Sequence, residues 1–362
     1  MSLLYEQVEV KNRYILIVYP GDINQGLFTP NARDNITEPF LLLRERCHEL
    51  GYVLKRADRQ ALSECAVLLF WDASSIRYGT GVKGLYRRLR YGDDARDWLS
   101  EAHRAGLADR VRLILWEPLS VHAKALDISI FNEFPVVLTW NDELVDGKRF
   151  YKFCYPIPAH VPVVEKIDFA KKKLLVNISQ NKFSVYPHEL YSARRDAIRY
   201  FERKRPEDFD LYGVGWDRPI IWFGSRWRRF GLRSVSKSYT SYRGTVKHKW
   251  EVLPRYRFSL CYENCSDQPG YITEKIFDCM RADCVPIYWG APNVTDYVDS
   301  DTFIDRRQFK SNEDLEEYIC SIDKHQFEEF REAIKSYLES DKFKRFLSNT
   351  WVNVILKALN LI

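Results

Sequence analysis

Short apolar runs recur along the first part of the chain and are separated by amphipathic segments. Runs of this length with almost no polar interruption are typical of parallel strands that are buried on both faces of a sheet. They lie at residues 14–19, 65–71, 111–116 and 136–140. We therefore predict that each run forms a buried strand of a first domain.

An amphipathic helix is predicted between the first two runs. Asn35 or Thr37 can cap its start, and Pro39 suits its first turn. Its apolar residues recur at helical spacing and share one face: Phe40, Leu43, Cys47 and Leu50. Gly51 then ends the helix. The order strand, helix, strand indicates an α/β fold, and a second, charged helix is predicted over residues 78–104.

The alternation restarts after a proline-rich segment. Residues 155–173 contain three prolines and little periodicity, which predicts a linker over 157–172. Beyond it we expect strands at 174–178, 209–213, 257–262, 284–289 and 302–304, and helices at 188–203, 274–282, 312–320 and 325–339. The predicted fold class is α/β, with two Rossmann-like domains over residues 1–156 and 173–340 that face a central cleft.

The last segment, residues 341–362, is predicted to form one more amphipathic helix. Its apolar face has two possible partners, the first domain or a membrane surface. Because the face is short and few cations flank it, we expect it to pack on the first domain.

Composition narrows the class of protein. The 10 Trp, 22 Tyr and 21 Phe supply enough apolar surface to exclude disorder as the dominant state. The net charge of +5 is small for 362 residues, so the whole-chain charge does not indicate a nucleic-acid partner.

The eight cysteines lie mostly in apolar runs and form no CxxC pair. This usage predicts buried free thiols in a reducing compartment. No window approaches ~20 uninterrupted apolar residues, and the charged first segment does not suit a signal peptide. We therefore expect a cytoplasmic protein, with peripheral membrane attachment as an alternative.

One segment departs from the even charge balance. Residues 224–249 hold eight Lys or Arg and no acidic residue, and aromatic residues are interleaved with them. Such a pattern suits a solvated loop, an anionic membrane, a phosphate-bearing ligand or RNA. We favour the loop or a membrane contact, and RNA least.

The most informative stretch is 256–290. It predicts a strand that ends at Glu263, a turn, and a helix that Thr273 caps and whose first turn presents Glu274 and Lys275. A helix N-terminus at the carboxyl end of a parallel strand favours phosphate, and Lys275 adds a positive charge there. From these residues alone, a capped surface helix with a solvated charge pair remains the alternative.

Two hexapeptides in this stretch carry a family resemblance. Tyr271–Ile276, followed by Val285–Gly290, resembles the donor-site signature of glycosyltransferase family 10, the α-1,3/1,4-fucosyltransferases. The resemblance is close over 241–306 and looser over 113–240. It implies a GT-B fold that binds GDP-fucose in the C-terminal domain and needs no metal or other cofactor.

The resemblance also implies roles for individual residues. Glu274 would hold the ribose hydroxyls and Lys275 the diphosphate, and Thr273 would be a further donor-binding residue. Tyr271 and Asn264 would line the pocket. The family also uses an arginine early in the first helix of the donor domain, where this chain offers Arg194 and Arg195; Arg194 aligns better, with a solvated arginine pair as the alternative.

The general base is expected from the first domain. Residues 113–118 form an apolar strand that ends in Glu117 beside a proline. A carboxylate beside Trp116 that faces a closing cleft would have a raised pKa, which suits it to accept a proton from an acceptor hydroxyl. Glu117 resembles the glutamate that acts as the general base in this family and that lies in a similar segment at the end of a strand. A Glu in solvent at the end of a strand is the alternative reading of Glu117.

Together these features predict an inverting fucosyltransferase that acts on a glycan hydroxyl, such as one of a lipopolysaccharide or a glycoprotein, in a bacterium or a virus. Two alternatives remain: the same fold with another nucleotide-sugar donor, or a binding module without turnover. Asp208–Asp210 and Asp299–Asp301 match the DxD pattern. We assign no metal to them, because such triplets arise easily in a chain with 29% charged residues.

Overall fold

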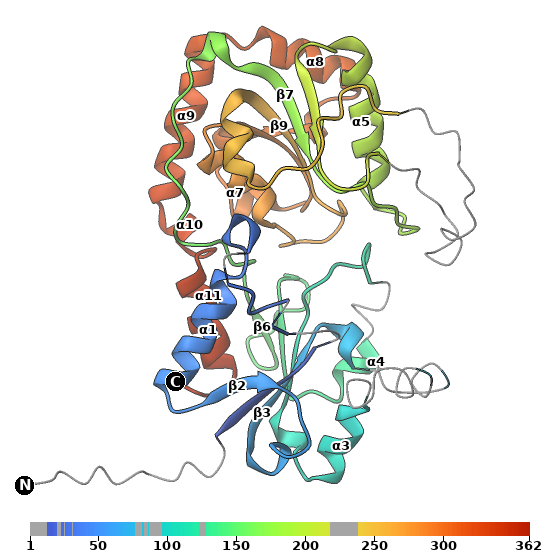
Figure 1. Cartoon of the computed structure of the whole chain (residues 1–362), viewed down its shortest axis with the longest axis vertical. Helices are drawn as coiled ribbons and strands as arrows, with labels where there is room; N and C mark the ends of the chain where they lie inside the picture. Colours follow the sequence, from blue (N-terminus) through green and yellow to red (C-terminus); the bar gives the residue numbers. More distant parts are fainter. Residues whose placement is uncertain are drawn as a thin grey trace, which may run out of the picture.

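The structure, a computed structural model, contains two parallel sheets in two lobes, which follow one another along the long axis of the molecule (Figure 1). It describes residues 13–19, 23–24, 26–30, 32–76, 82, 86, 96–122, 128–217 and 238–362. We call residues 13–152 the N-terminal lobe and residues 173–344 the C-terminal lobe. The α/β class predicted from the sequence is confirmed, because every strand pair in both sheets is parallel.

The N-terminal lobe is built on a six-stranded sheet with the order β2-β1-β3-β4-β5-β6. Its strands are β1 (Tyr14–Val18), β2 (Val53–Arg56), β3 (Cys65–Trp71), β4 (Val111–Ile114), β5 (Val136–Thr139) and β6 (Phe150–Lys152). Its helices are α1 (Glu38–Glu49), α3 (Trp98–Arg104) and α4 (Ile128–Phe131). The central strands β1, β3 and β4 are almost entirely buried, as the apolar runs predicted.

The C-terminal lobe is built on a five-stranded sheet with the order β11-β10-β9-β7-β8. Its strands are β7 (Lys173–Ile178), β8 (Phe209–Tyr212), β9 (Tyr256–Tyr262), β10 (Val285–Trp289) and β11 (Ile304–Asp305). Its helices are α5 (Tyr191–Lys204), α7 (Glu274–Arg281), α8 (Asn312–Ser321), α9 (Lys324–Glu339) and α10 (Asp341–Lys344). These elements lie within a few residues of those predicted.

Two strands of the first sheet have no counterpart in the prediction. β2 and β6 are its two edge strands. An edge strand has a neighbour on one side only, so β2 reads Val-Leu-Lys-Arg and β6 reads Phe-Tyr-Lys, without a long apolar run. Of the charged helix predicted over 78–104, the structure shows α3 at its end; most of residues 77–95 lie outside the described residues.

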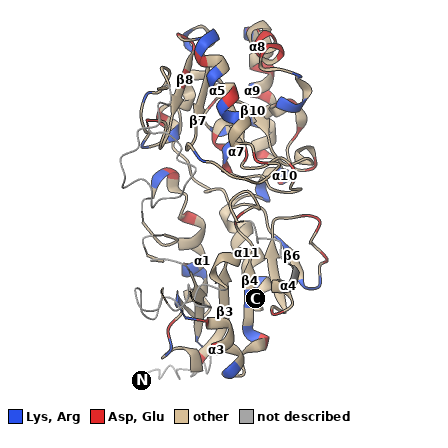
Figure 2. Cartoon of the chain, turned by 90° about the vertical axis from the view of Figure 1, so that its right-hand side faces the viewer, with Lys and Arg blue, Asp and Glu red and all other residues tan. Residues whose placement is uncertain are grey.

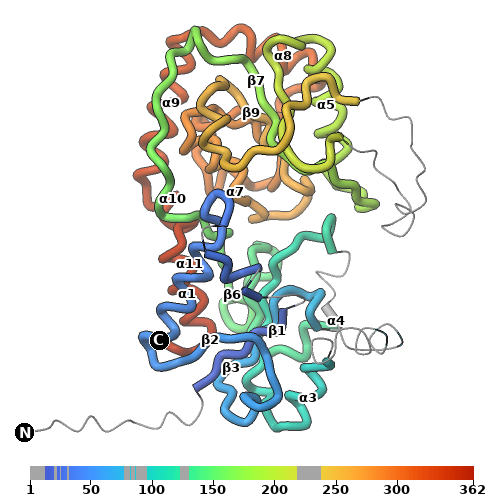
Figure 3. Tube along the Cα trace, in the orientation of Figure 1, coloured from blue at the N-terminus to red at the C-terminus, as the bar shows by residue number. Residues whose placement is uncertain are grey.

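The C-terminal segment packs back on the N-terminal lobe. The single helix predicted over 341–362 is divided into α10 and α11 (Ser348–Ala358), with a turn between them. α11 lies beside α1, where Figure 3 shows the red end of the chain against the blue beginning. Trp351, Val352 and Ile355 are buried in one cluster with Phe40. The expected docking is therefore confirmed, and the apolar face proposed as a membrane contact is covered by α1.

The segment between the lobes is tied to both of them. Ile157 is fully buried, and its N–H donates to the carbonyl of Phe346 at 2.6 Å. The N–H of Ala159 donates to Glu38 of α1 at 2.6 Å, while Arg281 of α7 donates to the carbonyl of Ala159 at 2.9 Å. The first residues of the predicted linker therefore make hydrogen bonds to both lobes and fix the position of α1 relative to α7.

Charged residues, cysteines and helix hydrophobicity can now be compared with the sequence analysis. Acidic and basic positions are interspersed over both lobes of the described ribbon (Figure 2). All eight cysteines are free, and six of them are buried, with Cys154 partly exposed and Cys320 exposed. Among the described residues, none of the helices is long and apolar enough to cross a membrane.

Candidate active site

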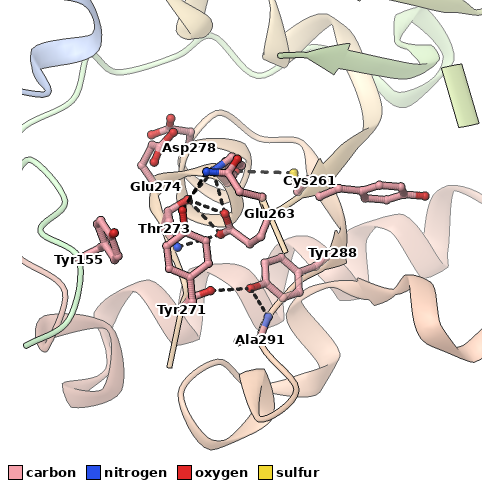
Figure 4. A network of polar contacts seen from close by, with 12 residues as sticks. Tyr155, Cys261, Glu263, Tyr271, Thr273, Glu274, Asp278, Tyr288 and Ala291 are labelled. Atoms are coloured by element: carbon pink, nitrogen blue, oxygen red, sulfur yellow. Dashed lines mark hydrogen bonds and ion pairs between the residues drawn. The ribbon is translucent and has the colours of Figure 1, made fainter. Parts of the chain in front are cut away.

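A buried carboxylate organises the start of α7. Glu263 follows β9 directly and is completely buried. It accepts hydrogen bonds from the N–H of Thr273 at 2.8 Å and from the hydroxyl of Thr273 at 2.9 and 3.0 Å, and it pairs with Nζ of Lys275 at 2.7 Å. Figure 4 shows Glu263 facing Thr273, with Glu274 at the start of α7 and Asp278 one turn further along the helix. Glu263 therefore sets the position of the 273–275 tripeptide.

The close packing around Glu263 explains the glycine that ends the second hexapeptide. A Cβ atom built on Gly290 would lie 2.5 Å from Cγ of Glu263 and 2.4 Å from the hydroxyl of Tyr288. Both distances are shorter than side-chain carbons tolerate. Only glycine leaves room for the Glu263 carboxylate at this point.

Thr273 does not cap the helix through its side chain. It occupies the N-cap position, but its hydroxyl makes no cap hydrogen bond and donates to Glu263 instead. The hydroxyl also accepts a hydrogen bond from Lys275 at 2.8 Å. The N-cap position predicted for Thr273 is therefore confirmed, but its side chain forms no cap hydrogen bond, because the buried carboxylate is a stronger acceptor and lies within reach.

Glu274 is held ionised by two ammonium groups. Burial opposes ionisation, but Lys275 and Lys249 outweigh it and lower the pKa of Glu274 to about 2. Nζ of Lys249 lies 3.5 Å from Glu274 and also pairs with Asp278. Burial acts against the charge of Lys275 too, but Glu263 and Glu274 raise its pKa overall. The site thus presents a fixed carboxylate between fixed cations, suited to accept hydrogen bonds from a diol beside a phosphate.

The two arginines of α5 differ in their surroundings. Arg194 is buried and donates to the carbonyls of Tyr262 and Glu263 at 2.5 and 3.0 Å. Arg195 instead donates to the carbonyl of Lys182 and to Ser192 near the surface. The sequence did not decide which of the two arginines lies at the site. The structure places Arg194 at the end of β9 and Arg195 near the surface.

These residues border a cavity of about 370 Å³, which we call the cationic cavity. Five cationic and two acidic side chains are among the described residues that line it: Arg33, Lys182, Arg194, Lys249, Lys275, Asp34 and Glu274. Asn264 lines it as well. Its lining includes residues that follow the carboxyl ends of β7 and β8, which is where α/β sheets bind ligands.

Tyr271 does not line the cationic cavity. It is 3% exposed, and its ring packs against Trp140 at 4.9 Å and Tyr155 at 5.5 Å, so it lies between the two lobes. Its hydroxyl accepts a hydrogen bond from the amide of Asn264 at 3.0 Å. The pocket position expected of Tyr271 is therefore corrected: the residue orients Asn264 from behind.

Glu117 lies across from α7, three residues after the end of β4. It lines a second cavity of about 470 Å³, the aromatic cavity, whose walls include Tyr19, Phe40, Trp71, Trp116 and Tyr155. Burial, together with the charge of Asp72, raises the pKa of Glu117, while Lys182 and Lys275 act in the opposite direction. The direction of this pKa shift and its main cause are those expected from the sequence.

The two cavities adjoin each other. Asp34, Ile36 and Glu274 line both of them. Glu117 and Glu274 therefore line one cavity, and Glu274 and Lys275 line the cavity that adjoins it. A ligand held by Lys275 and Glu274 would present its far end toward the Glu117 carboxylate.

Three residues in or beside the two cavities were not identified as site residues from the sequence: Asp34, Lys249 and Glu263. Asp34 is 4% exposed and has a left-handed backbone with φ 54° and ψ 22°. Its carboxylate accepts a hydrogen bond from the N–H of Lys249 at 2.9 Å, which ties the two lobes together. Of the basic segment 224–249, Lys249 thus reaches the cationic cavity, whereas residues 224–237 lie outside the described residues.

The DxD-like triplets have protein partners. Asp210 is buried and pairs with Lys173, Arg243 and the hydroxyl of Tyr256 at 2.6 to 2.7 Å. Asp299 pairs with Lys342 at 2.5 Å. Among the described residues, the structure brings together no group of three metal-ligating side chains.

The two arginines provide a matched pair for a binding experiment. For the GDP donor that the family resemblance implies, we expect Arg194→Met to weaken binding about 10- to 150-fold, the range of a hydrogen bond to a charged group. Arg195→Met is expected to change it less than about twofold, because Arg195 does not line the cationic cavity. Calorimetric titration with GDP measures both, and thermal melts report whether loss of the bonds to Tyr262 and Glu263 unfolds Arg194→Met. A GDP affinity that depends on Arg195 and not on Arg194 would reverse the assignment.

Comparison with known proteins confirms the resemblance in the second half of the chain. Residues 230–350 match the family model of glycosyltransferase family 10 (fucosyltransferase), C-terminal part. The α-(1,3)-fucosyltransferase FucT of Helicobacter pylori is 39% identical over 80 residues, which cover 22% of this chain and 16% of that protein. GDP-fucose protein O-fucosyltransferase 3 of Xenopus laevis is 40% identical over 77 residues, which cover 20% and 16%. The chain thus spans about one sixth of the length of these relatives.

Solved structures extend the likeness to the whole chain. A crystal structure of α1,3-fucosyltransferase with GDP has a TM-score of 0.53 and covers 99% of this chain and 93% of its own, at 14% identity. A second α1,3-fucosyltransferase structure has a TM-score of 0.54 at 15% identity and covers 97% and 92%. At such low identity the likeness shows the fold, which is the predicted GT-B arrangement of two facing α/β domains.

Proposed function

We propose that this chain, which carries the C-terminal domain of glycosyltransferase family 10 in residues 230–350, is an inverting fucosyltransferase that uses GDP-fucose. One observation carries the proposal. Glu117 of one lobe and the Glu274 and Lys275 pair of the other line adjoining cavities that share Glu274. The relatives named above are fucosyltransferases, and one of the similar solved structures was crystallised with GDP.

The proposed reaction is a single displacement at the anomeric carbon of fucose. Cations of the cationic cavity stabilise the charge that builds on the leaving diphosphate, and Glu274 binds the ribose hydroxyls. Glu117 takes the proton from an acceptor hydroxyl as that oxygen forms its bond to the sugar. β-linked GDP-L-fucose then gives an α-L-fucoside. Charge stabilisation by Lys275, Arg194 and Lys249 fits a reaction without a metal.

The acceptor is proposed to be a glycan that binds in the aromatic cavity. Its walls combine aromatic rings with the carboxylates of Asp72, Glu117 and Asp278. Aromatic faces pack against sugar rings, and carboxylates accept hydrogen bonds from sugar hydroxyls. A cytoplasmic location is proposed as well; it rests on the cysteine usage.

A donor and acceptor screen tests the function. We expect GDP release from GDP-fucose in the presence of a glycan array, unchanged by EDTA, and no release of UDP from UDP sugars. Release of UDP alone would mean that the enzyme uses a UDP sugar as its donor, while the proposed fold would stand. Tight binding of GDP without turnover on any acceptor would favour a binding module instead.

A further inference from the structure

Asp72 has a backbone conformation that side chains rarely adopt. It follows β3 directly, is 5% exposed, and has φ 68° and ψ 154°. Asp34 also has a positive φ, but its ψ of 22° lies in the left-handed region that Asp and Asn tolerate. The region of Asp72 is essentially restricted to glycine, and residues held there by their surroundings cluster at functional sites.

The surroundings of Asp72 fix this conformation from both sides. Its N–H donates to the carbonyl of Ile114 at 2.8 Å, so the end of β3 is tied to the end of β4. Its carbonyl accepts hydrogen bonds from the N–H and the hydroxyl of Ser75, at 3.0 and 2.7 Å. The side chain is thereby directed across the sheet toward the residues that follow β4.

The carboxylate of Asp72 binds the segment that carries Glu117. One oxygen accepts hydrogen bonds from the N–H groups of both Trp116 and Glu117, each at 3.2 Å. These two amides follow the last residues that pair in β4, so no strand neighbour satisfies them. Asp72 and Glu117 also line the same aromatic cavity. The contact therefore determines where the Glu117 side chain leaves the sheet.

Asp72 is also one of several ionisable groups around Glu117. The carboxylates of Asp72 and Glu274 act to raise its pKa, and the ammonium groups of Lys182 and Lys275 act to lower it. Phenol groups interact with the Glu117 charge as well: Tyr19, Tyr155, Tyr191 and Tyr271. Of the four charged groups, Asp72 alone belongs to the N-terminal lobe, so its effect does not depend on how closely the lobes approach.

We propose that Asp72 is the positioning residue for Glu117: its carboxylate fixes the backbone of residues 116–117, and its negative charge makes the Glu117 carboxylate a better proton acceptor. The positioning part stands on the hydrogen bonds, whereas the benefit for catalysis rests on the proposed function. A negative charge this close disfavours a second one, so Glu117 binds a proton more readily beside Asp72 than it would alone.

Two substitutions separate the two roles. Asp72→Asn has nearly the same shape, keeps an oxygen acceptor for the two amides and removes the charge, so the backbone strain stays as it is in the wild type. Asp72→Gly relieves the backbone and removes the acceptor. Asp109→Asn makes the same charge change in the same lobe at the other end of β4, where Asp109 is exposed, and serves as the control.

The first readout does not require activity. In protein labelled with 13C at the glutamate carboxyls, with Glu117→Gln used for assignment, we expect Glu117 to titrate at lower pH in Asp72→Asn than in the wild type. Asp109→Asn should leave the titration unchanged. Hydrogen exchange at the amides of 116 and 117 should stay protected in Asp72→Asn and become at least about tenfold faster in Asp72→Gly. An unchanged Glu117 titration, or unchanged exchange in the glycine variant, would overturn the proposal.

The second readout uses the transfer reaction. The acidic limb of kcat/KM against pH should move to lower pH in Asp72→Asn, with KM for the donor unchanged, since a purely structural defect would lower activity at every pH. Asp72→Gly should lose kcat by about tenfold or more, because misplacement of a catalytic group is costly. If the wild type transfers no fucose, the proposed function fails, while the titration and exchange data still decide the role of Asp72.

Discussion

Replacement of Glu117 by glutamine is expected to lower the transfer rate by about 10²- to 10⁴-fold, the usual contribution of a general base. Glutamine has the same shape but cannot take the proton of the acceptor hydroxyl. GDP affinity should stay within about twofold, because Glu117 lines the aromatic cavity and not the cationic one. Steady-state rates and calorimetric titration with GDP measure the two quantities.

The same group predicts the pH dependence. A base works only when it is deprotonated, and burial beside Asp72 raises the pKa of Glu117 above its usual value of 4.5. Activity should therefore fall as the pH drops through this raised pKa, and the residual activity of Glu117→Gln should lack that limb. Glu143→Gln, the same change at an exposed position of the N-terminal lobe, is the control. Equal turnover by Glu117→Gln would refute the assignment of the base.

Loss of the Lys275 ammonium is expected to weaken GDP binding about 10- to 150-fold, the range of a hydrogen bond to a charged group. Lys275→Met alone would leave the buried Glu263 without its cation, which destabilises a fold strongly. The informative variant is therefore Lys275→Met combined with Glu263→Gln. Glutamine still accepts the hydrogen bond of the Thr273 N–H, so the start of α7 should keep its shape.

Glu263→Gln by itself is the matched control for this double variant. It keeps Lys275 and removes only the buried negative charge, so its GDP affinity should stay within about threefold of the wild type. Calorimetry with GDP and thermal melts of both proteins separate binding from folding. If the double variant binds GDP as tightly as Glu263→Gln does, Lys275 does not contact the diphosphate.

Much of the fold could be read from local pattern. The central strands β1, β3, β4 and β9 are buried on both faces, so their sequences are apolar without a partner needing to be known. The edge strands β2 and β6 escaped prediction because half of their environment is solvent or loop, which leaves no continuous run to recognise.

The candidate site divides in the same way. Glu274, Lys275 and Glu117 could be predicted because a strand end or helix start places each of them, and the family motif marks two of them. Asp34 and Asp72 could not, because their partners lie far along the chain, and Glu263 could not, because only the folded turn brings the start of α7 back to the end of β9. Asp72 lies 44 residues from Trp116, and Asp34 lies 215 residues from Lys249.

The amino-acid sequence by itself determined the α/β class, the two sheets and the residues that end their strands. Buried strands and amphipathic helices each leave a characteristic pattern of apolar residues over a few neighbouring positions. Tertiary structure alone decided that Arg194 faces the cationic cavity and Arg195 does not, that Thr273 serves Glu263 rather than the helix end, and that Tyr271 lies behind the cavity wall. The hydrogen-bond partners and the burial of these side chains depend on contacts between segments that are distant in the sequence. The pattern of neighbouring residues does not predict such contacts.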